Sequence, residues 1–215
     1  MICIFAVKTD DLPSVKKLEK QVMIDVGDEK REAWNRQPDC CAKESVVGIL
    51  LLQYAMEQAG CSPVGASLAY EAKGRPYLKG VELDFSISHS DSVVVCAVEQ
   101  NSDETAPRIG VDVETVRNRS EDSMERNAER WFTESERKMF FADKQEMQFL
   151  RIWTGKEALC KRSGEGLSEV SKWDVTDLPQ ELRITTYHIQ NGVISLCHGS
   201  DTVPPENVEW IRNRW

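Results

Sequence analysis

Ile109-Gly-Val-Asp-Val-Glu114 is the stretch of sequence that decides the fold. Side chains alternate between the two faces of a strand, so the three apolar residues of this stretch point to one side while Asp112 and Glu114 share the other. The pattern predicts a buried strand that carries two neighbouring carboxylates at its end. Carboxylate oxygens, waters and substrate phosphates are the ligands that Mg²⁺ prefers. Paired acids are also common on exposed edge strands, so this pair alone leaves both interpretations open.

A later helix supplies a third carboxylate, within Trp153-Thr-Gly-Lys-Glu-Ala-Leu-Cys-Lys161. Glu157 lies one helical turn before Lys161, so one side of the helix can present an oxygen ligand and a cation that faces a phosphate. Lys156 instead falls within the apolar stripe of a helix predicted over 145–163. A lysine in such a stripe either extends to solvent or meets an anion, and the sequence leaves both open.

Glu136 has a structural interpretation of its own. Thr133-x-x-Glu136 is a capping-box pattern, in which the glutamate side chain hydrogen-bonds back to the start of the helix. Glycine-rich phosphate loops are absent from the sequence, since neither G-x-x-x-x-G-K-[ST] nor G-x-G-x-x-G occurs. Any bound phosphate must therefore be held by a metal ion, by lysines and by the turn at Ser88 and His89.

Three further segments accompany the acidic elements. They are Gly74-Arg-Pro76, Phe85-Ser-Ile-Ser-His-Ser90 and Ala128-Glu-Arg-Trp-Phe-Thr-Glu-Ser-Glu136. Together with the acids, this ordered set resembles the Sfp-type 4′-phosphopantetheinyl transferases, the enzymes that activate acyl and peptidyl carrier proteins. The resemblance runs from about Lys30 to the C-terminus, and its second half is the specific part.

The resemblance implies an α+β fold made of two similar α/β halves, a pseudo-dimer within one chain, with the active site at the interface of the halves. We expect an N-terminal half over 1–104, on the 3′-phosphate and adenine side of coenzyme A. A C-terminal half over 105–215 would carry the metal, the catalytic residues and the carrier docking surface. The polar stretch Asn101–Pro107 is the best linker candidate. Hairpins are predicted in both halves, over 85–99 and over 182–197.

The implied reaction transfers 4′-phosphopantetheine from coenzyme A to a serine of an apo acyl or peptidyl carrier protein and releases 3′,5′-ADP. It uses Mg²⁺ or Mn²⁺. The resemblance assigns six residues to this chemistry: Asp112, Glu114 and Glu157 as metal ligands, Lys161 and Lys156 at the leaving group, and Glu136 as general base. Because the nucleophile belongs to the partner, the chain needs no catalytic serine or cysteine of its own.

The resemblance also implies a coenzyme A site of basic and hydroxyl side chains, formed by Lys30, Arg36, Lys43, Ser45, Arg75, Ser88, His89 and Lys161. Family members commonly carry an arginine shortly before the serine or threonine at the start of the central helix of the first half, where it holds the 3′-phosphate. Here that position is Glu44. The helix is predicted over 43–59, and whether Lys43 replaces the missing arginine stays open.

Composition bounds the remaining functions. A formal net charge of −9 over 215 residues argues against a general nucleic-acid or anionic-membrane binder. The longest apolar runs are far too short for a membrane span, and the N-terminus lacks the pattern of a signal peptide. Seven cysteines form no C-x-x-C pair, so we expect free thiols in a reducing cytoplasm. Two halves in one chain can complete a site, so we expect a monomer.

The carrier partner needs a docking surface. Carrier proteins are usually acidic, so an acidic chain requires a local basic and apolar patch; the candidate lies between the acid pair and Glu136 and consists of Arg117, Arg119, Arg126, Arg130 and Met124. Two alternatives to the transferase remain. One is a coenzyme A or carrier-protein binding module without activity, which only Glu44 favours. The other is a different metal-dependent phosphate hydrolase that uses water as the nucleophile.

Overall fold

The computed structural model describes residues 1–100, 108–212 and 214–215, so the predicted linker over 101–107 lies outside the described residues. The fold is mixed α/β, as the sequence predicts. Its strands are β1 (Ile2–Lys8), β2 (Ser67–Tyr70), β3 (Pro76–Lys79), β4 (Leu83–Ser90), β5 (Val93–Gln100), β6 (Gly110–Thr115), β7 (Leu182–Ile189), β8 (Gly192–Gly199) and β9 (Glu209–Trp210). The first sheet has the order β4-β5-β1-β9, the second β6-β8-β7, and β2 pairs with β3.

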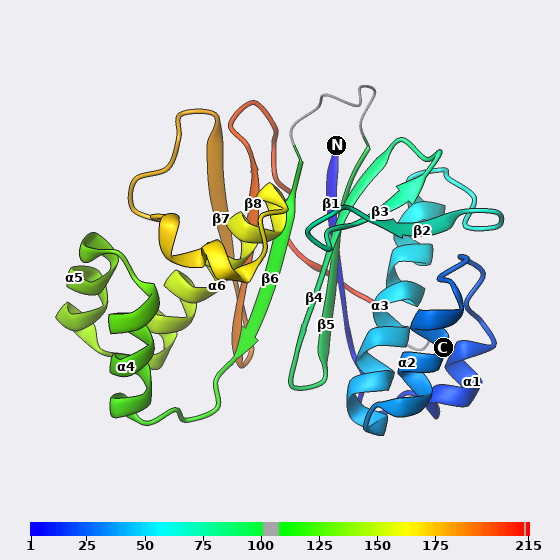
Figure 1. Cartoon of the computed structure of the whole chain (residues 1–215), viewed down its shortest axis with the longest axis horizontal. Coiled ribbons are helices and arrows are strands. Elements are labelled where there is room, and N and C mark those ends of the chain that lie inside the picture. Colours follow the sequence, from blue (N-terminus) through cyan, green and yellow to red (C-terminus); the bar gives the residue numbers. More distant parts are fainter. Residues whose placement is uncertain (101–107, 213) are drawn as a thin grey trace.

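The first and second sheets pack against each other through a shared apolar core, with helices on the outer side of each (Figure 1). Along β5 the odd-numbered residues Val93 to Ala97 belong to this core, while the even-numbered residues Val94 to Val98 pack on the helical side. Burial on both faces explains why this strand reads as a continuous apolar run rather than an alternating one. Both predicted hairpins are confirmed as the antiparallel pairs β4–β5 and β7–β8.

Three helices cover the first sheet: α1 (Val15–Glu19), α2 (Asp28–Arg36) and α3 (Asp39–Gln58). The central helix α3 is confirmed, although it begins four residues before the predicted start. A helix is also predicted by the apolar spacing from Leu12 to Val26, and this prediction is wrong, since α1 ends at Glu19. The reason is tertiary: Gln53 of α3 accepts hydrogen bonds from the backbone N–H groups of Met23 and Ile24, which a longer helix would have used itself.

The second sheet is covered by α4 (Glu121–Trp131), α5 (Glu134–Asp143) and α6 (Glu146–Ser163), followed by a short 3₁₀ helix η1 (Leu167–Lys172). Helix α6 confirms the prediction over 145–163. It lies directly on β6 because Gly110 has no side chain: a Cβ atom there would stand 2.0 Å from the carbonyl oxygen of Ala158. This close approach brings the acidic helix onto the acidic strand.

The two sheets meet along a seam between β4 and β6, which are not paired through their backbones. Alternate side chains of β4 join them instead. Asp84 Oδ2 accepts from the backbone N–H of Ile109 at 2.7 Å, and Ser86 Oγ accepts from that of Val111 at 3.0 Å. Ser88 and Ser90 continue the series onto the acids of β6. The seam is therefore a ladder of side chains from one sheet to the backbone and side chains of the other.

The C-terminal segment returns to the first sheet, where β9 pairs in parallel with β1. A boundary between halves at 104/105 therefore stays a prediction, and the last strand would belong to the sheet of the first half. Within the described part of the chain, no helix has both the length and the apolarity required to cross a membrane.

Candidate active site

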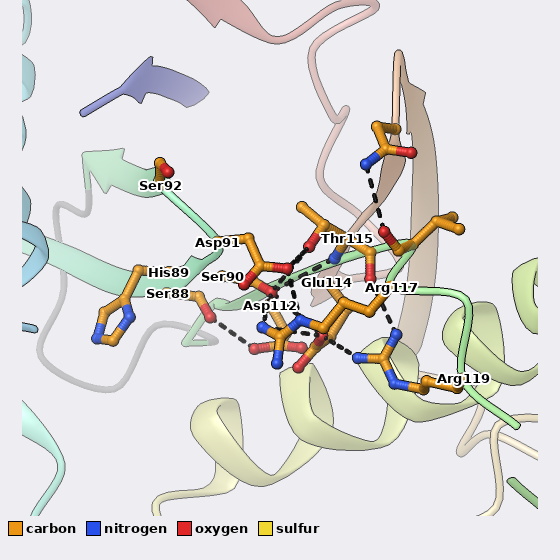
Figure 2. A network of polar contacts seen from close by, with 12 residues as sticks. Ser88, His89, Ser90, Asp91, Ser92, Asp112, Glu114, Thr115, Arg117 and Arg119 are labelled. Carbon is orange, nitrogen blue, oxygen red and sulfur yellow. Dashed lines mark hydrogen bonds and ion pairs between the residues drawn. The ribbon is translucent and has the colours of Figure 1, made fainter. Parts of the chain in front are cut away.

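Asp112 lies on β6 at the seam and is almost fully buried, with 2% of its surface exposed. Its Oδ1 atom accepts a hydrogen bond from Ser88 Oγ at 2.6 Å (Figure 2) and another from Lys161 Nζ at 2.7 Å, so three elements meet at one carboxylate oxygen. Its Oδ2 atom is buried without a hydrogen-bond partner in the described structure. A buried carboxylate oxygen without a donor is unfavourable unless a ligand supplies the missing contact.

Glu114 faces the same side of β6, and its Oε2 atom accepts from Arg119 Nη2 at 2.7 Å and from Ser90 Oγ at 3.1 Å. None of the described residues donates a hydrogen bond to its Oε1 atom. Glu114 therefore repeats the pattern of Asp112: one oxygen is fixed by protein donors and the other is left over.

Glu157 on α6 completes what we call the acid centre, formed by Asp112, Glu114 and Glu157. Burial, and then the neighbouring carboxylate of Asp112, raise the pKa of Glu157 to about 8, while Lys161 opposes this shift. Glu114 adds to the increase. Such repulsion arises only when like charges lie close together in a poorly solvated place, so the structure brings these three acids into one another's range.

The acid centre fits a hard divalent cation by its donor set. Three carboxylates with leftover oxygens, one of them buried and unbonded, match the oxygen ligands that Mg²⁺ prefers. Within the described ranges, however, no three His, Cys, Asp or Glu side chains are already arranged as a metal site. The protein's own cations hold the acids here, with Lys161 on Asp112 and Arg119 on Glu114.

Glu136 and Lys156 form a separate, fully buried ion pair, with Lys156 Nζ 2.6 Å from Glu136 Oε2 and 0% exposure of both side chains. Glu136 also accepts from the backbone N–H groups of Thr133 and Val175, each at 2.8 Å, and Lys156 donates to the carbonyl oxygen of Trp173. The capping box is confirmed. Both oxygens of Glu136 are already bonded within the protein, and its role as general base stays a prediction.

Several residues predicted for the coenzyme A site contact other groups of the protein. His89 Nδ1 lies 3.0 Å from Glu44 Oε2, and Ser45 Oγ accepts from Trp34 Nε1 at 2.9 Å. Lys43 Nζ lies 3.4 Å from the carbonyl oxygen of Leu12. The exposed Arg36 pairs with Glu32 at 3.7 Å, and burial lowers the pKa of the Lys30 ammonium. The structure thus places His89 beside Glu44, and the binding of coenzyme A by these residues stays a prediction.

Arg75 lies inside the seam rather than on an open surface. It is 7% exposed, pairs with Asp84 Oδ1 at 2.7 Å and donates to the carbonyl oxygens of Ile109 and Lys161. Beside it is a cavity of about 200 Å³, lined by residues that include Pro76, Phe85, Cys160, Lys161 and Leu167. Arg75 contacts groups at the seam, its contact with coenzyme A stays a prediction, and both Arg75 and Lys161 line the cavity.

The predicted docking patch is corrected in part. Met124 is buried, and Arg119 is bound to Glu114 and to Glu146, so neither can offer a docking surface. Arg126 and Arg130 of the patch are exposed. Sequence reasoning missed the contacts of Ser90 and Arg119 with Glu114 and of Arg119 with Glu146, because no spacing rule connects these residues.

Residues 108–207 match a family model described as the 4′-phosphopantetheinyl transferase superfamily. The chain is similar to a 4′-phosphopantetheinyl transferase of Bacillus subtilis, with 32% identity over 166 residues that cover 74% of this chain and 69% of that protein. It is 32% identical over 129 residues to 4′-phosphopantetheinyl transferase HetI of a Nostoc species, covering 57% of this chain and 52% of HetI. The 4′-phosphopantetheinyl transferase psf-1 of Bacillus pumilus is 29% identical over 174 residues, covering 77% of this chain and 70% of psf-1.

Proposed function

Since the chain belongs to the 4′-phosphopantetheinyl transferase superfamily and is an enzyme of that kind, we propose that it transfers 4′-phosphopantetheine from coenzyme A to a serine of an apo acyl or peptidyl carrier protein. The reaction would use Mg²⁺, or Mn²⁺ in its place, and release 3′,5′-ADP. The observation that carries this proposal is the acid centre, where Asp112 and Glu114 each retain an oxygen without a hydrogen bond next to Glu157.

The acid centre also supports a site between two halves. Ser88 comes from the first sheet, Asp112 from the second and Lys161 from α6, and they meet at one oxygen atom. We therefore propose the pseudo-dimer with halves over 1–104 and 105–215, modified by the return of β9 to the first sheet. A complete site within one chain supports a monomer. The seven cysteines are free thiols, which is compatible with the cytoplasmic location that we propose.

The chemistry of the site follows from the residues around it. Asp112, Glu114 and Glu157 would hold the divalent ion, which supplies charge neutralisation at the diphosphate of the donor when it is bound. Ser88 keeps the Asp112 carboxylate in place by its hydrogen bond at 2.6 Å. Lys161, with 26% of its side chain exposed, donates to Ser88 and Asp112 and can turn its third N–H group toward the phosphate that leaves.

The transfer itself needs no nucleophile from this chain. The serine oxygen of the carrier attacks the β-phosphorus of coenzyme A, the bond from that phosphorus to the oxygen of the leaving 3′,5′-ADP breaks, and the serine proton departs to solvent. Positioning and electrostatic stabilisation then provide most of the rate. The burial of Glu136 and Lys156 supports a structural role for both, in place of the general base and the leaving-group contact that the resemblance implies.

The decisive experiment mixes the protein with coenzyme A, Mg²⁺ and an apo carrier protein and measures the mass of the carrier. A mass gain of one phosphopantetheine group is expected, and it should disappear with Asp112→Ala and with Glu157→Ala. Tight binding of coenzyme A without a mass gain would instead indicate a binding module. Release of phosphate without carrier modification would indicate a hydrolase.

A further inference from the structure

Arg119 forms several polar contacts around the acid centre that no sequence pattern predicts (Figure 2). Its Nη2 atom donates to Glu114 Oε2 at 2.7 Å, and its Nη1 atom donates to Glu146 Oε1 at 2.7 Å and to the carbonyl oxygen of Thr115 at 2.9 Å. Its side chain is 20% exposed. The planar guanidinium can bind two carboxylates at once, which a lysine cannot do with the same geometry.

Glu146, the second carboxylate, is the first residue of α6. Besides the Arg119 side chain, it accepts hydrogen bonds from the backbone N–H groups of Arg117 at 2.9 Å and of Arg119 at 3.2 Å. Burial raises its pKa, but these hydrogen bonds and the arginine charge outweigh burial and leave the pKa lowered. Glu146 thus remains a charged anchor for the segment that follows β6.

The bridge Glu114–Arg119–Glu146 connects the end of β6 to the beginning of α6. Glu157 lies about three helical turns further along α6, where the helix rests on Gly110 of β6. Helix α6 is therefore fixed to the acidic strand at two points, one through packing at Gly110 and one through the arginine. The distance between the acids of β6 and Glu157 depends on both points.

Arg119 leaves room for a ligand on Glu114. It binds Oε2, the same oxygen that Ser90 binds, whereas no hydrogen bond from the described part of the chain reaches Oε1. The arginine therefore orients the carboxylate without covering it. A guanidinium that bound both oxygens would instead compete with a cation for Glu114.

We propose that Arg119, anchored by Glu146, is the positioning residue of the acid centre: it orients Glu114 and fixes the start of α6, so that Glu157 meets the acids of β6. This inference rests on the proposed function, because it takes the acid centre as the place where the divalent ion binds. Arg119 itself touches neither the donor nor the carrier serine in this role.

The test measures the dissociation constant of Mn²⁺ by electron paramagnetic resonance in the absence of coenzyme A. Arg119→Ala should weaken Mn²⁺ binding by about 10-fold to 100-fold, the range typical of residues that orient metal ligands, with smaller losses for Arg119→Lys and Glu146→Gln. Arg151→Ala is the matched control, since Arg151 is an exposed arginine on α6 whose side chain has no polar partner in the described structure. In the transfer assay, Arg119→Ala should raise the Mg²⁺ concentration for half-maximal rate, and kcat should largely recover at saturating Mg²⁺.

An unchanged or tighter Mn²⁺ affinity in Arg119→Ala would overturn the inference, even if the thermal stability falls, because the arginine would then be only structural or a competitor of the ion. If Arg119→Ala does not fold, Arg119→Lys and Glu146→Gln decide by the same criterion. If the wild-type protein modifies the carrier and the variants keep their Mn²⁺ affinity, only the positioning role is refuted. A wild-type protein that neither binds Mn²⁺ nor modifies carrier refutes the proposed function as well.

Discussion

Helix α6 carries two lysines, five residues apart, that bind carboxylates in opposite ways. Lys156 and Glu136 are fully buried, and every oxygen of Glu136 has a donor. Lys161 is 26% exposed, and its partner Asp112 keeps a buried oxygen without any donor. Both pairs join a lysine to a carboxylate. They differ in whether the hydrogen-bonding capacity of the carboxylate is already filled, and on this difference we base the proposal that the first pair is structural and the second reactive.

Lys156→Met should give the largest effect, on stability. Removing the lysine leaves the Glu136 carboxylate buried without its counter-ion, which typically costs about 3–5 kcal/mol of the free energy of unfolding. Urea denaturation followed by circular dichroism measures the loss. The double variant Glu136→Gln/Lys156→Met is the control and should recover most of it. If Lys156→Met is stable but has lost transfer activity, Lys156 takes part in the reaction, and the two lysine–carboxylate pairs do not differ in the proposed way.

Asp112→Asn should affect activity and stability in opposite directions. The rate of carrier modification should fall on the order of 100-fold, because a charge at the centre of the site is removed. The free energy of unfolding should stay constant or increase, since the Asp112 charge is one cause of the raised pKa of Glu157. Asp122→Asn, at an exposed position of α4, is the control for the change of charge. A clear loss of stability would show that Asp112, like Glu136, belongs to a filled structural pair.

Gly110→Ala tests whether the reactive pair depends on the close packing of α6 on β6. The new Cβ atom would stand 2.0 Å from the carbonyl oxygen of Ala158, so the helix must move. We expect a loss of about 1–3 kcal/mol in the free energy of unfolding together with slower transfer. Gly48→Ala on α3 is the matched control, because its Cβ would meet side chains rather than backbone, the nearest being Ile87 at 3.0 Å. Wild-type transfer rates in Gly110→Ala would mean that the placement of Lys161 tolerates movement of the helix.

His198 offers a third, smaller case, a buried group that is kept neutral instead of paired. Burial lowers its pKa, and its ring contacts the Thr185 hydroxyl and the carbonyl oxygen of Gly199. The unfolded chain therefore binds more protons than the folded one below the ordinary pKa of 6.5, and stability should decrease as the pH falls from about 7 toward 5. Urea unfolding at pH 7.5 and 5.5, compared with His198→Asn, should show less than about 1 kcal/mol attributable to this group. A pH dependence that survives in His198→Asn would assign the effect to other groups.

The sequence predicted those parts of the structure that depend on local patterns. Alternation along 109–114 predicted β6, and the capping-box spacing predicted the contact of Glu136 with Thr133, because both rules act over a few residues. The sequence did not reveal where the helix after Leu12 ends, because the end of this helix depends on hydrogen bonds to Gln53, which lies far along the chain.

The candidate site was predicted from residue types but not from its contacts. The family resemblance brought Asp112, Glu114 and Glu157 together, whereas no spacing rule connects Arg119 with Glu146, 27 residues later. Met124 was predicted to be a docking residue and is buried in the structure, since an apolar residue on a short helix can face either side. Burial and the count of donors around each oxygen are three-dimensional properties, and they determine which acids react.

The side-chain ladder between β4 and β6 links ligand binding at the acid centre to the junction of the two sheets. Ser88 belongs to that ladder and also hydrogen-bonds to Asp112. A ligand that binds Asp112 therefore also affects the hydrogen bonds that join the two sheets. Because each rung uses a side chain of β4 rather than a backbone-to-backbone hydrogen bond, one rotamer change can alter a rung without breaking a strand. Ligand binding at the acid centre should therefore slow amide hydrogen exchange at Val111 and Thr115, whose N–H groups donate hydrogen bonds to Ser86 and Ser90.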